Sequence, residues 1–190
     1  MNIGILSLQG SIIEHINAVK ALGHNPIKVK LPEHLENISA LIIPGGESTT
    51  ISKLIQEYNL DKAIIKKHNQ GLPIFGICAG SILLAKNIIN DSLPTLNLLD
   101  ISIKRNDYGR QIDSFETKLQ IKNFSKPFHS IFIRAPSIHS YNSDSEILAE
   151  FQNKPVMLRQ NNILITTFHP ELTEDLRVHK YFVDMVKNYF

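Results

Sequence analysis

The hydrophobic pattern of the first half of the chain alternates between buried strands and amphipathic helices. Continuous apolar runs predict strands covered on both faces, whereas apolar residues spaced three and four positions apart predict helices with one buried face. The predicted elements are a strand at 3–8, a helix at 12–22, strands at 27–31 and 40–43, helical segments at 49–69, and a strand and helix within 72–85. This order indicates a doubly wound α/β fold.

The first predicted helix begins with a recognisable start signal. Ser11 and Glu14 have the spacing of a capping box, and Gly23 follows the last apolar position. Its apolar face is predicted from the residues at 12, 13, 16, 19 and 22. The polar residues Glu14, His15 and Asn17 are then expected on the outer face.

From about residue 86 the pattern changes to short strands. These are predicted at 98–105, 114–121, 128–133, 146–151, 156–159 and 163–167. Thr173 is a potential N-cap for a last helix, with apolar positions at Val178, Tyr181, Phe182, Met185, Val186 and Tyr189. We expect one domain over 1–190, with a mostly parallel twisted sheet, helices on both faces and β-rich extensions in the second half.

Composition narrows the class of protein. The 190 residues are 43% hydrophobic and 20% charged, with a net charge of +2 and one cysteine. Basic residues are scattered, so we expect no nucleic-acid partner. The longest apolar stretch is too short to span a bilayer, and a strand starts the chain, so we expect neither a membrane partner nor a signal peptide. A single cysteine excludes an intrachain disulfide and suits a reducing, cytoplasmic compartment.

The segment 72–85 combines a fold signal with a chemical one. An apolar strand runs into the turn Gly76-Ile77-Cys78-Ala79-Gly80, and an apolar helix follows. A strand-to-helix turn between glycines is typical of the nucleophile elbow of α/β enzymes. The turn places the Cys78 thiol at a helix N-terminus, where the dipole favours a thiolate. Taken by itself, a lone cysteine is more often inert core packing.

Two other segments follow apolar strands and bring polar groups to the same region. They are Phe168-His169-Pro170-Glu171 and Pro44-Gly45-Gly46-Glu47-Ser48. Because parallel strands gather their functional loops outside their carboxyl ends, we expect these segments to lie near Cys78. Cysteine, histidine and carboxylate would then converge although they are distant in sequence.

These residue types suit acyl transfer. His169 would take the proton of Cys78, and Glu171 would orient the imidazole. The backbone amide of Ala79 and one from the Gly45-Gly46 turn suit a developing oxyanion.

Plainer interpretations of the same residues stay open at this level. His169 and Glu171 also fit a loop histidine beside a carboxylate, and Gly45-Gly46 also fits a tight turn before a helix capped by Ser48 or Thr49. The turn lacks the Gly-Lys-Ser/Thr of a phosphate loop. The eight histidines show no metal-ligand spacing, so no metal site is expected.

Six short motifs occur along nearly the whole chain. They are Leu8-Gln9-Gly10 with Glu14-His15, Pro44-Gly45-Gly46-Glu47-Ser48-Thr49-Thr50, Gly76-Ile77-Cys78-Ala79-Gly80, Arg105-Asn106 with Gly109-Arg110-Gln111, Phe132-Ile133-Arg134-Ala135-Pro136, and Phe168-His169-Pro170-Glu171-Leu172-Thr173. On these residues the chain resembles the glutaminase subunits of pyridoxal 5'-phosphate synthases, which are triad-type (class I) glutamine amidotransferases of flavodoxin-like fold. The cysteine elbow and His-x-Glu are common to all triad amidotransferases. The Gly-Glu-Ser-Thr, Arg-Asn and Phe-Ile-Arg-Ala-Pro segments point to this family.

The resemblance implies a role for each matching residue. Cys78 would be the nucleophile, His169 the acid/base and Glu171 its orienting group, with oxyanion amides from Gly46 and Ala79. The implied glutamine-binding residues are Gly46, Glu47, Ser48, Arg105, Ile133 and Arg134. An arginine fork suits the α-carboxylate of glutamine, and acceptors such as Glu47 suit its ammonium, but the contact made by each residue stays open. Without the resemblance, Arg105 and Arg134 would be assigned to surface salt bridges.

The resemblance also implies a reaction and a partner. L-glutamine would be hydrolysed through a cysteinyl thioester, and the ammonia would pass to a barrel-shaped synthase subunit that forms pyridoxal 5'-phosphate. No cofactor is implied. The outer face of the first helix, with Glu14, His15 and Asn17, is a candidate docking surface, although a solvated polar face is the plainer interpretation.

Two alternatives and two departures accompany this interpretation. The chain also fits a glutaminase of another synthase, such as imidazole glycerol phosphate synthase, or a catalytically silent regulatory homologue. Ser81 stands where a larger apolar residue is usual, and Asp107-Tyr108 where small or aromatic residues are common. The second departure leaves the packing of the loop near Arg105 open.

Overall fold

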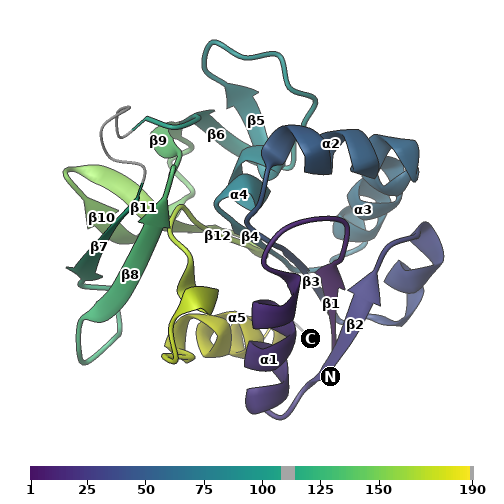
Figure 1. Ribbon diagram of the computed structural model, residues 1–190, viewed down its shortest axis with the longest axis horizontal. Helices are drawn as coiled ribbons and strands as arrows, with labels where there is room; N and C mark the ends of the chain where they lie inside the picture. Colours follow the sequence, from purple (N-terminus) through teal and green to yellow (C-terminus); the bar gives the residue numbers. More distant parts are fainter. Residues whose placement is uncertain (108–113, 189–190) are drawn as a thin grey trace.

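The computed structural model describes residues 1–107 and 114–188 (Figure 1). Its central sheet has seven strands in the order β10-β11-β12-β4-β3-β1-β2. The strands are β1 (Asn2–Leu6), β2 (Asn25–Val29), β3 (Ala40–Ile43), β4 (Ile74–Ile77), β10 (Glu146–Phe151), β11 (Lys154–Gln160) and β12 (Ile163–Thr166). β12, β4, β3, β1 and β2 run parallel to one another, whereas β11 pairs antiparallel with both β12 and β10. The predicted fold class, a mostly parallel α/β sheet, is confirmed.

Helices cover both faces of this sheet (Figure 1). They are α1 (Ile12–Ala21), α2 (Ser48–Glu57), α3 (Leu60–Asn69), α4 (Ala79–Leu84) and α5 (Arg177–Lys187), with the short 3-10 helices η1 (Pro32–Asn37) and η2 (Pro170–Leu172). Alternate residues of β3 and β4 point into two apolar clusters. One cluster contains side chains of α2, α3 and α4, and the other contains side chains of α1 and α5. The inner strands are therefore buried on both faces, as their continuous apolar runs predict.

The second half of the chain adds two small sheets. One has the order β5-β6-β9 and the other pairs β7 with β8. Their strands are β5 (Ala85–Ile88), β6 (Leu99–Lys104), β7 (Ser114–Leu119), β8 (Phe128–Ile133) and β9 (Ser137–Tyr141). The expected β-rich extensions are present, although the sequence pattern did not predict β5 or β9. Both strands are short, and most residues of β9 are exposed, which weakens their alternating signal.

The helical segments predicted at 49–69 are α2 and α3, which are separated at Asn59, a residue in a left-handed conformation with φ 54°. The caps predicted for α1 and α5 are wrong. Ser11 precedes α1, but its side chain makes no capping hydrogen bond, and its amide donates to the Gly45 carbonyl instead. Thr173 does not cap α5, since its hydroxyl donates to the Pro170 carbonyl and closes a turn four residues before the helix begins at Arg177.

The predicted faces of α1 also need one correction. His15 is fully buried, whereas Ile13 is 56% exposed. The buried residues of α1 are His15, Ile16, Ala18 and Val19, whose spacing matches a helical face that excludes Ile13. His15 therefore cannot belong to an outer docking surface, although Glu14 and Asn17 are exposed as expected. Among the described residues, no helix has the length and apolar character needed to cross a bilayer.

Candidate active site

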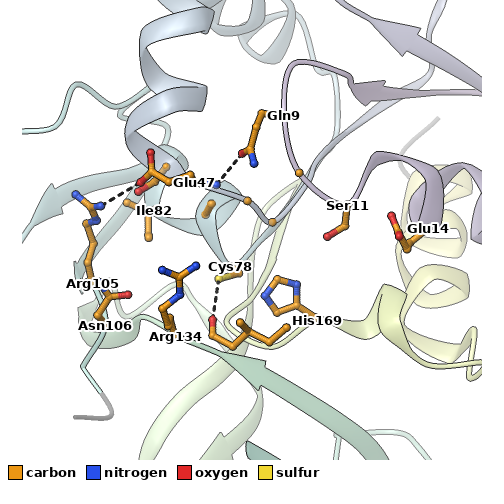
Figure 2. A pocket seen from close by; sticks show the side chains of 16 residues that line it. Gln9, Ser11, Glu14, Glu47, Cys78, Ile82, Arg105, Asn106, Arg134 and His169 are labelled. Atoms are coloured by element: carbon orange, nitrogen blue, oxygen red, sulfur yellow. Dashed lines mark hydrogen bonds and ion pairs between the residues drawn. The ribbon is translucent and has the colours of Figure 1, made fainter. Parts of the chain in front are cut away.

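A cavity of about 520 Å³ lies where the loops after β1, β3, β4, β8 and β12 meet. Its lining residues are Gln9, Gly10, Ser11, Glu14, Gly45, Gly46, Glu47, Ser48, Cys78, Ala79, Ile82, Arg105, Asn106, Ile133, Arg134 and His169. Figure 2 shows Cys78 and His169 among the side chains that point into this space. The structure thus gathers every sequence-predicted glutamine contact around one cavity. Of the predicted site residues, only Glu171 does not line the cavity.

Cys78 occupies the sharp turn between β4 and α4. Its φ of 49° and ψ of −98° place it in a region that residues with a Cβ rarely adopt, as a nucleophile elbow requires. The backbone amide of Cys78 donates to the Thr166 carbonyl over 2.8 Å, which ties the turn to β12. The thiol lies 3.9 Å from the Ile133 carbonyl oxygen, and the residue is 7% exposed.

Ser81, one of the two departures from the family pattern, has a definite place beneath this turn. It is fully buried, and its hydroxyl lies 2.8 Å from the Thr166 carbonyl and 3.1 Å from the Gly76 carbonyl. The hydroxyl therefore connects α4 to β12 and β4, where a larger apolar side chain would offer no such hydrogen bond.

His169 and Glu171 form a buried pair at the end of β12. Nδ1 of His169 lies 2.8 Å from Oε1 of Glu171, and the two residues are 5% and 7% exposed. The His169 amide donates to the Ile131 carbonyl of β8, which fixes the backbone of the loop. Gly45 lies against the imidazole, since a Cβ at that position would come within 2.4 Å of Cε1 of His169.

The surroundings of this pair favour charge on both partners. Burial by itself would lower the pKa of His169, but its contacts with Cys78 and Glu171 raise that pKa to about 10. Burial would raise the pKa of Glu171, but the hydrogen bond from His169 and the nearby His15 lower it to about 2. At neutral pH the site therefore holds a carboxylate on Glu171 and an imidazolium on His169, which lies beside the Cys78 thiol.

The glycine turn after β3 is held close to the end of β1. The Glu47 amide donates to Oε1 of Gln9 over 2.7 Å, and the Ser11 amide donates to the Gly45 carbonyl over 3.1 Å. Gly10 has φ 109°, and a Cβ there would lie 1.8 Å from the Gly45 carbonyl oxygen, so the two loops meet at backbone distance. This contact places Gly46 at the cavity, across from Ala79 at the first position of α4.

Glu47 and Arg105 are paired at one side of the cavity (Figure 2). The Glu47 carboxylate accepts hydrogen bonds from the amides of Thr49 and Thr50, so Glu47 is the N-cap of α2 in place of the predicted Ser48 or Thr49. Nη1 of Arg105 lies 2.6 Å from Asp91, and Nη2 lies 3.5 Å from Glu47. Arg105 thus makes the salt bridges of the plainer interpretation and lines the cavity as well.

Ile133 and Arg134 approach the cavity from the end of β8. Arg134 has φ 41°, a strained value for a residue with a Cβ, and its side chain is exposed. Phe132 anchors the strand from below, because it is fully buried between Phe115 and Phe168.

Asp107 lies two residues after Arg105 and fixes the end of that segment. Its carboxylate accepts hydrogen bonds from Ser137 and His139 of β9 and pairs with Lys104 and Lys154. Burial opposes ionisation, but these four partners hold the pKa of Asp107 far below its usual range. The departure at 107 is therefore a polar junction between β6, β9 and β11. The predicted motif residues Gly109, Arg110 and Gln111, with Tyr108, lie outside the described residues.

Several lining residues had no predicted role. Gln9, Ser11, Ile82 and Asn106 line the cavity, and the sequence offered only motif membership or position after a strand as signals. Two buried histidines behind Glu171, His15 and His179, were also missed as a group. Within 1–107 and 114–188, no cluster of histidine, cysteine and carboxylate side chains is arranged to hold a metal ion.

Comparisons with known proteins agree with this geometry. Residues 5–188 match the SNO glutamine amidotransferase family. A protein of Thermotoga neapolitana named "Pyridoxal 5'-phosphate synthase subunit PdxT" is 50% identical over 188 residues, covering 98% of this chain and all of the relative. A protein of the same name from Moorella thermoacetica is 50% identical over 187 residues, covering 98% of this chain and all of the relative.

A solved structure gives the same result in three dimensions. A crystal structure described as a glutamine amidotransferase superimposes with a TM-score of 0.93 at 44% identity, covering 97% of this chain and 98% of the other. The resemblance drawn from the six motifs is therefore confirmed. The chain belongs to the SNO glutamine amidotransferase family.

Proposed function

We propose that this chain is the glutaminase subunit of a pyridoxal 5'-phosphate synthase. It hydrolyses L-glutamine to L-glutamate and ammonia, and the ammonia is used by a partner synthase subunit. The observation that carries the proposal is the cavity in which the only cysteine stands on a strained elbow beside an imidazole paired with a buried carboxylate. The names of the relatives at 50% identity support the pathway.

The first half of the reaction forms a thioester. The Cys78 thiolate attacks the side-chain amide carbon of glutamine, and the carbonyl oxygen gains negative charge. The amides of Gly46 and Ala79 receive that charge, as an oxyanion hole does. His169, held as an imidazolium by Glu171, donates its proton to the departing nitrogen, so that ammonia leaves and the acyl group stays on sulfur.

The second half returns the enzyme to its starting state. Neutral His169 takes a proton from a water molecule, which attacks the thioester carbon. The tetrahedral intermediate collapses, glutamate leaves, and Cys78 is released as a thiolate beside the imidazolium. Glu171 stays ionised throughout and keeps Nδ1 of His169 as the protonated nitrogen.

The charged side chains around the cavity suit the rest of the substrate. Arg105 and Arg134 are assigned to the α-carboxylate, and Glu47 to the α-ammonium, with Ser48 and Ile133 completing the walls. Glutamine binding then requires Arg105 to exchange part of its pairing with Glu47 and Asp91 for the substrate.

The partner is assigned as the barrel-shaped subunit of the synthase, in a hetero-oligomer with this chain. Ammonia released in water is protonated near neutral pH and diffuses away, so transfer across an interface protects it. We further assign residues 1–190 to one glutamine amidotransferase domain, since β12 inserts between β4 and β11 and joins both halves in one sheet. The location assigned is the cytoplasm, a reducing compartment that suits a catalytic thiol.

Substitution of the nucleophile tests the proposal. Cys78→Ala is expected to abolish glutamate release from glutamine, because no other side chain at the cavity offers a thiolate. The measurement is glutamate formation with and without the synthase subunit, followed by mass detection of a thioester on the Cys78 peptide of the unaltered chain. Binding of Cys78→Ala to the synthase should persist, and unchanged turnover in this variant would refute the assignment.

The same assay separates the alternatives. Stimulation by a histidine-pathway barrel would identify a glutaminase of another synthase, a role that the relatives' names do not support. Absence of turnover with either barrel would identify a silent regulatory homologue.

A further inference from the structure

Two buried histidines lie on the side of Glu171 that faces the core. His15 on α1 is fully buried, and His179 on α5 is 1% exposed. Nδ1 of His15 lies 3.0 Å from Nε2 of His179, and Nε2 of His15 lies 3.8 Å from Oε1 of Glu171. That same carboxylate oxygen accepts from His169. The polar groups therefore form a continuous line from the cavity to the space between α1 and α5.

Packing needs do not explain this pair. His179 lies in an otherwise apolar environment, 6.0 Å from the ring of Phe75, and α1 and α5 bury aliphatic and aromatic residues around it. Burying two imidazoles costs free energy that a leucine or phenylalanine would not. Nε2 of His15, Nδ1 of His179 and Oε2 of Glu171 even lack a hydrogen-bond partner within the described part of the chain. Such a cost is expected where the polar groups act on a functional site.

The proton positions follow from the surroundings. Burial lowers the pKa of His15, opposed by Glu171, and burial lowers that of His179 to about 3, so both rings are neutral at neutral pH. Their 3.0 Å contact then needs one donor and one acceptor. If Nε2 of His179 donates, His15 carries its proton on Nε2, which faces the carboxylate. The opposite assignment would set a nitrogen lone pair against the negative charge of Glu171.

The charged and titratable groups that face His15 are few. Glu171 and His169 face it from the end of β12, Glu14 acts from α1 itself, and His179 faces it from α5. Among these, only Glu171 offers a buried negative charge to the Nε2–H dipole. At 3.8 Å the attraction is that of a charge and a dipole, and a small movement would make it a hydrogen bond.

We propose that His15, oriented by His179, is a positioning residue that holds the Glu171 carboxylate against His169. The proposal rests on the triad assigned in the proposed function and goes beyond it. Neither histidine lines the cavity, so neither is expected to touch glutamine. Loss of His15 would leave His169 as the one partner of Glu171. The Glu171 carboxylate would then hold the His169 ring less firmly and would stabilise its protonated form less.

Two variants of His15 separate positioning from packing. His15→Leu keeps an apolar volume and removes the donor, whereas His15→Gln keeps an N–H near the place of Nε2. For His15→Leu we expect kcat for glutamate release in the presence of the synthase subunit to fall by about tenfold or more, with KM for glutamine unchanged within about twofold. His15→Gln should recover most of kcat. A half-buried histidine of α3 provides the control, since His68→Leu should leave both constants unchanged.

A second readout needs no turnover. Because Cys78 is the only cysteine, alkylation by iodoacetamide reports its thiolate alone. In His15→Leu the alkylation rate at pH 7 should fall, and its pH profile should move to higher pH, since a weakened Glu171 favours the imidazolium less. His15→Gln should alkylate nearly as the unaltered chain does.

The outcomes are distinguishable. Unaltered protein that alkylates normally but releases no glutamate would overturn the proposed function, while the alkylation comparison would still decide the role of His15. Wild-type kcat and wild-type alkylation in His15→Leu would overturn the inference alone, because a packing role tolerates leucine. If His15→Leu does not fold, His179→Phe serves in its place, and the same two unchanged readouts would refute the proposal.

Discussion

Cys78 shows how a single residue can carry both strain and chemistry. Its left-handed backbone conformation costs of the order of 1–3 kcal/mol and persists because β4, β12 and α4 fix the turn on all sides. His169 is held in a different way, by the Ile131 carbonyl, the Glu171 carboxylate and the backbone of Gly45. The two side chains to which the reaction is assigned are therefore held in place by contacts that do not involve a substrate.

Buried ionisable residues make the stability of the protein depend on pH. The pKa of His179 is about 3 in the folded chain against an ordinary 6.5, and that of Glu171 is about 2 against 4.5. In both cases the unfolded chain binds its proton first as the pH falls. The stability contributed by each group is therefore complete above the ordinary pKa and is lost as the pH falls towards the folded value.

Replacement of His179 tests this relation. His179→Phe should reduce the loss of unfolding free energy between pH 7.5 and pH 4.5 by about 2.7 kcal/mol, because pH 4.5 lies two units below the ordinary pKa of 6.5 and each unit corresponds to about 1.4 kcal/mol. Urea denaturation at a series of pH values measures the loss. His129→Phe on the surface is the control, and equal pH slopes in all three proteins would contradict the prediction.

At the scale of elements, strands of the second half of the chain position Arg105 at the cavity. β6 brings Arg105 to the cavity, and the Asp107 carboxylate ties the end of that segment to β9 and β11 through Ser137, His139 and Lys154. The small sheets therefore do more than extend the fold. They set the place of the guanidinium assigned to the substrate carboxylate.

Asp107→Ala is expected to loosen this junction. With the carboxylate removed, Arg105 should sample more positions, so KM for glutamine should rise by about threefold to tenfold with little change in kcat. Steady-state glutaminase assays with the synthase subunit measure both constants. As a matched control, Glu146→Ala breaks a surface ion pair with Lys122 and should change neither constant. An unchanged KM in Asp107→Ala would show that the junction does not position Arg105.

At the scale of the whole molecule, three exposed apolar side chains lie on segments that also carry residues of the cavity or of the Glu171 pair. Ile13 on α1, Ile133 at the end of β8 and Leu172 in η2 are 56%, 36% and 38% exposed. Glu14 and Asn17 add polar groups on α1. This combination of apolar and polar groups suits an interface with the synthase subunit that is proposed to use the ammonia. We therefore expect the docking surface on α1 to include Ile13 in place of His15.

Ile13→Asp tests that surface. A charge in place of an exposed isoleucine should weaken binding to the synthase subunit by about tenfold or more while leaving the melting temperature nearly unchanged. Isothermal titration calorimetry measures the affinity. Leu31→Asp places the same charge at another exposed apolar position and should bind normally. Equal affinities of the two variants would remove α1 from the interface.

The sequence by itself determined the order of the main elements and singled out the residues to which the chemistry is assigned. Runs such as 40–43 and 128–133 coincide with β3 and β8. A strand buried on both faces has a continuous apolar run and a strand buried on one face alternates apolar and polar residues, so both can be recognised in the sequence. The elbow at Cys78 and the strand-end position of His169 also followed from local sequence, since parallel strands place their carboxyl ends at one edge.

Only the tertiary structure decided how residues far apart share one environment. The placement of His15 inside the core, its pairing with His179 and the junction at Asp107 each depend on partners distant in the chain. A hydrophobic pattern averages over many residues and records which face is buried. It does not record which polar side chain meets which, because that depends on distances set when α1, α5 and the small sheets pack against the central one.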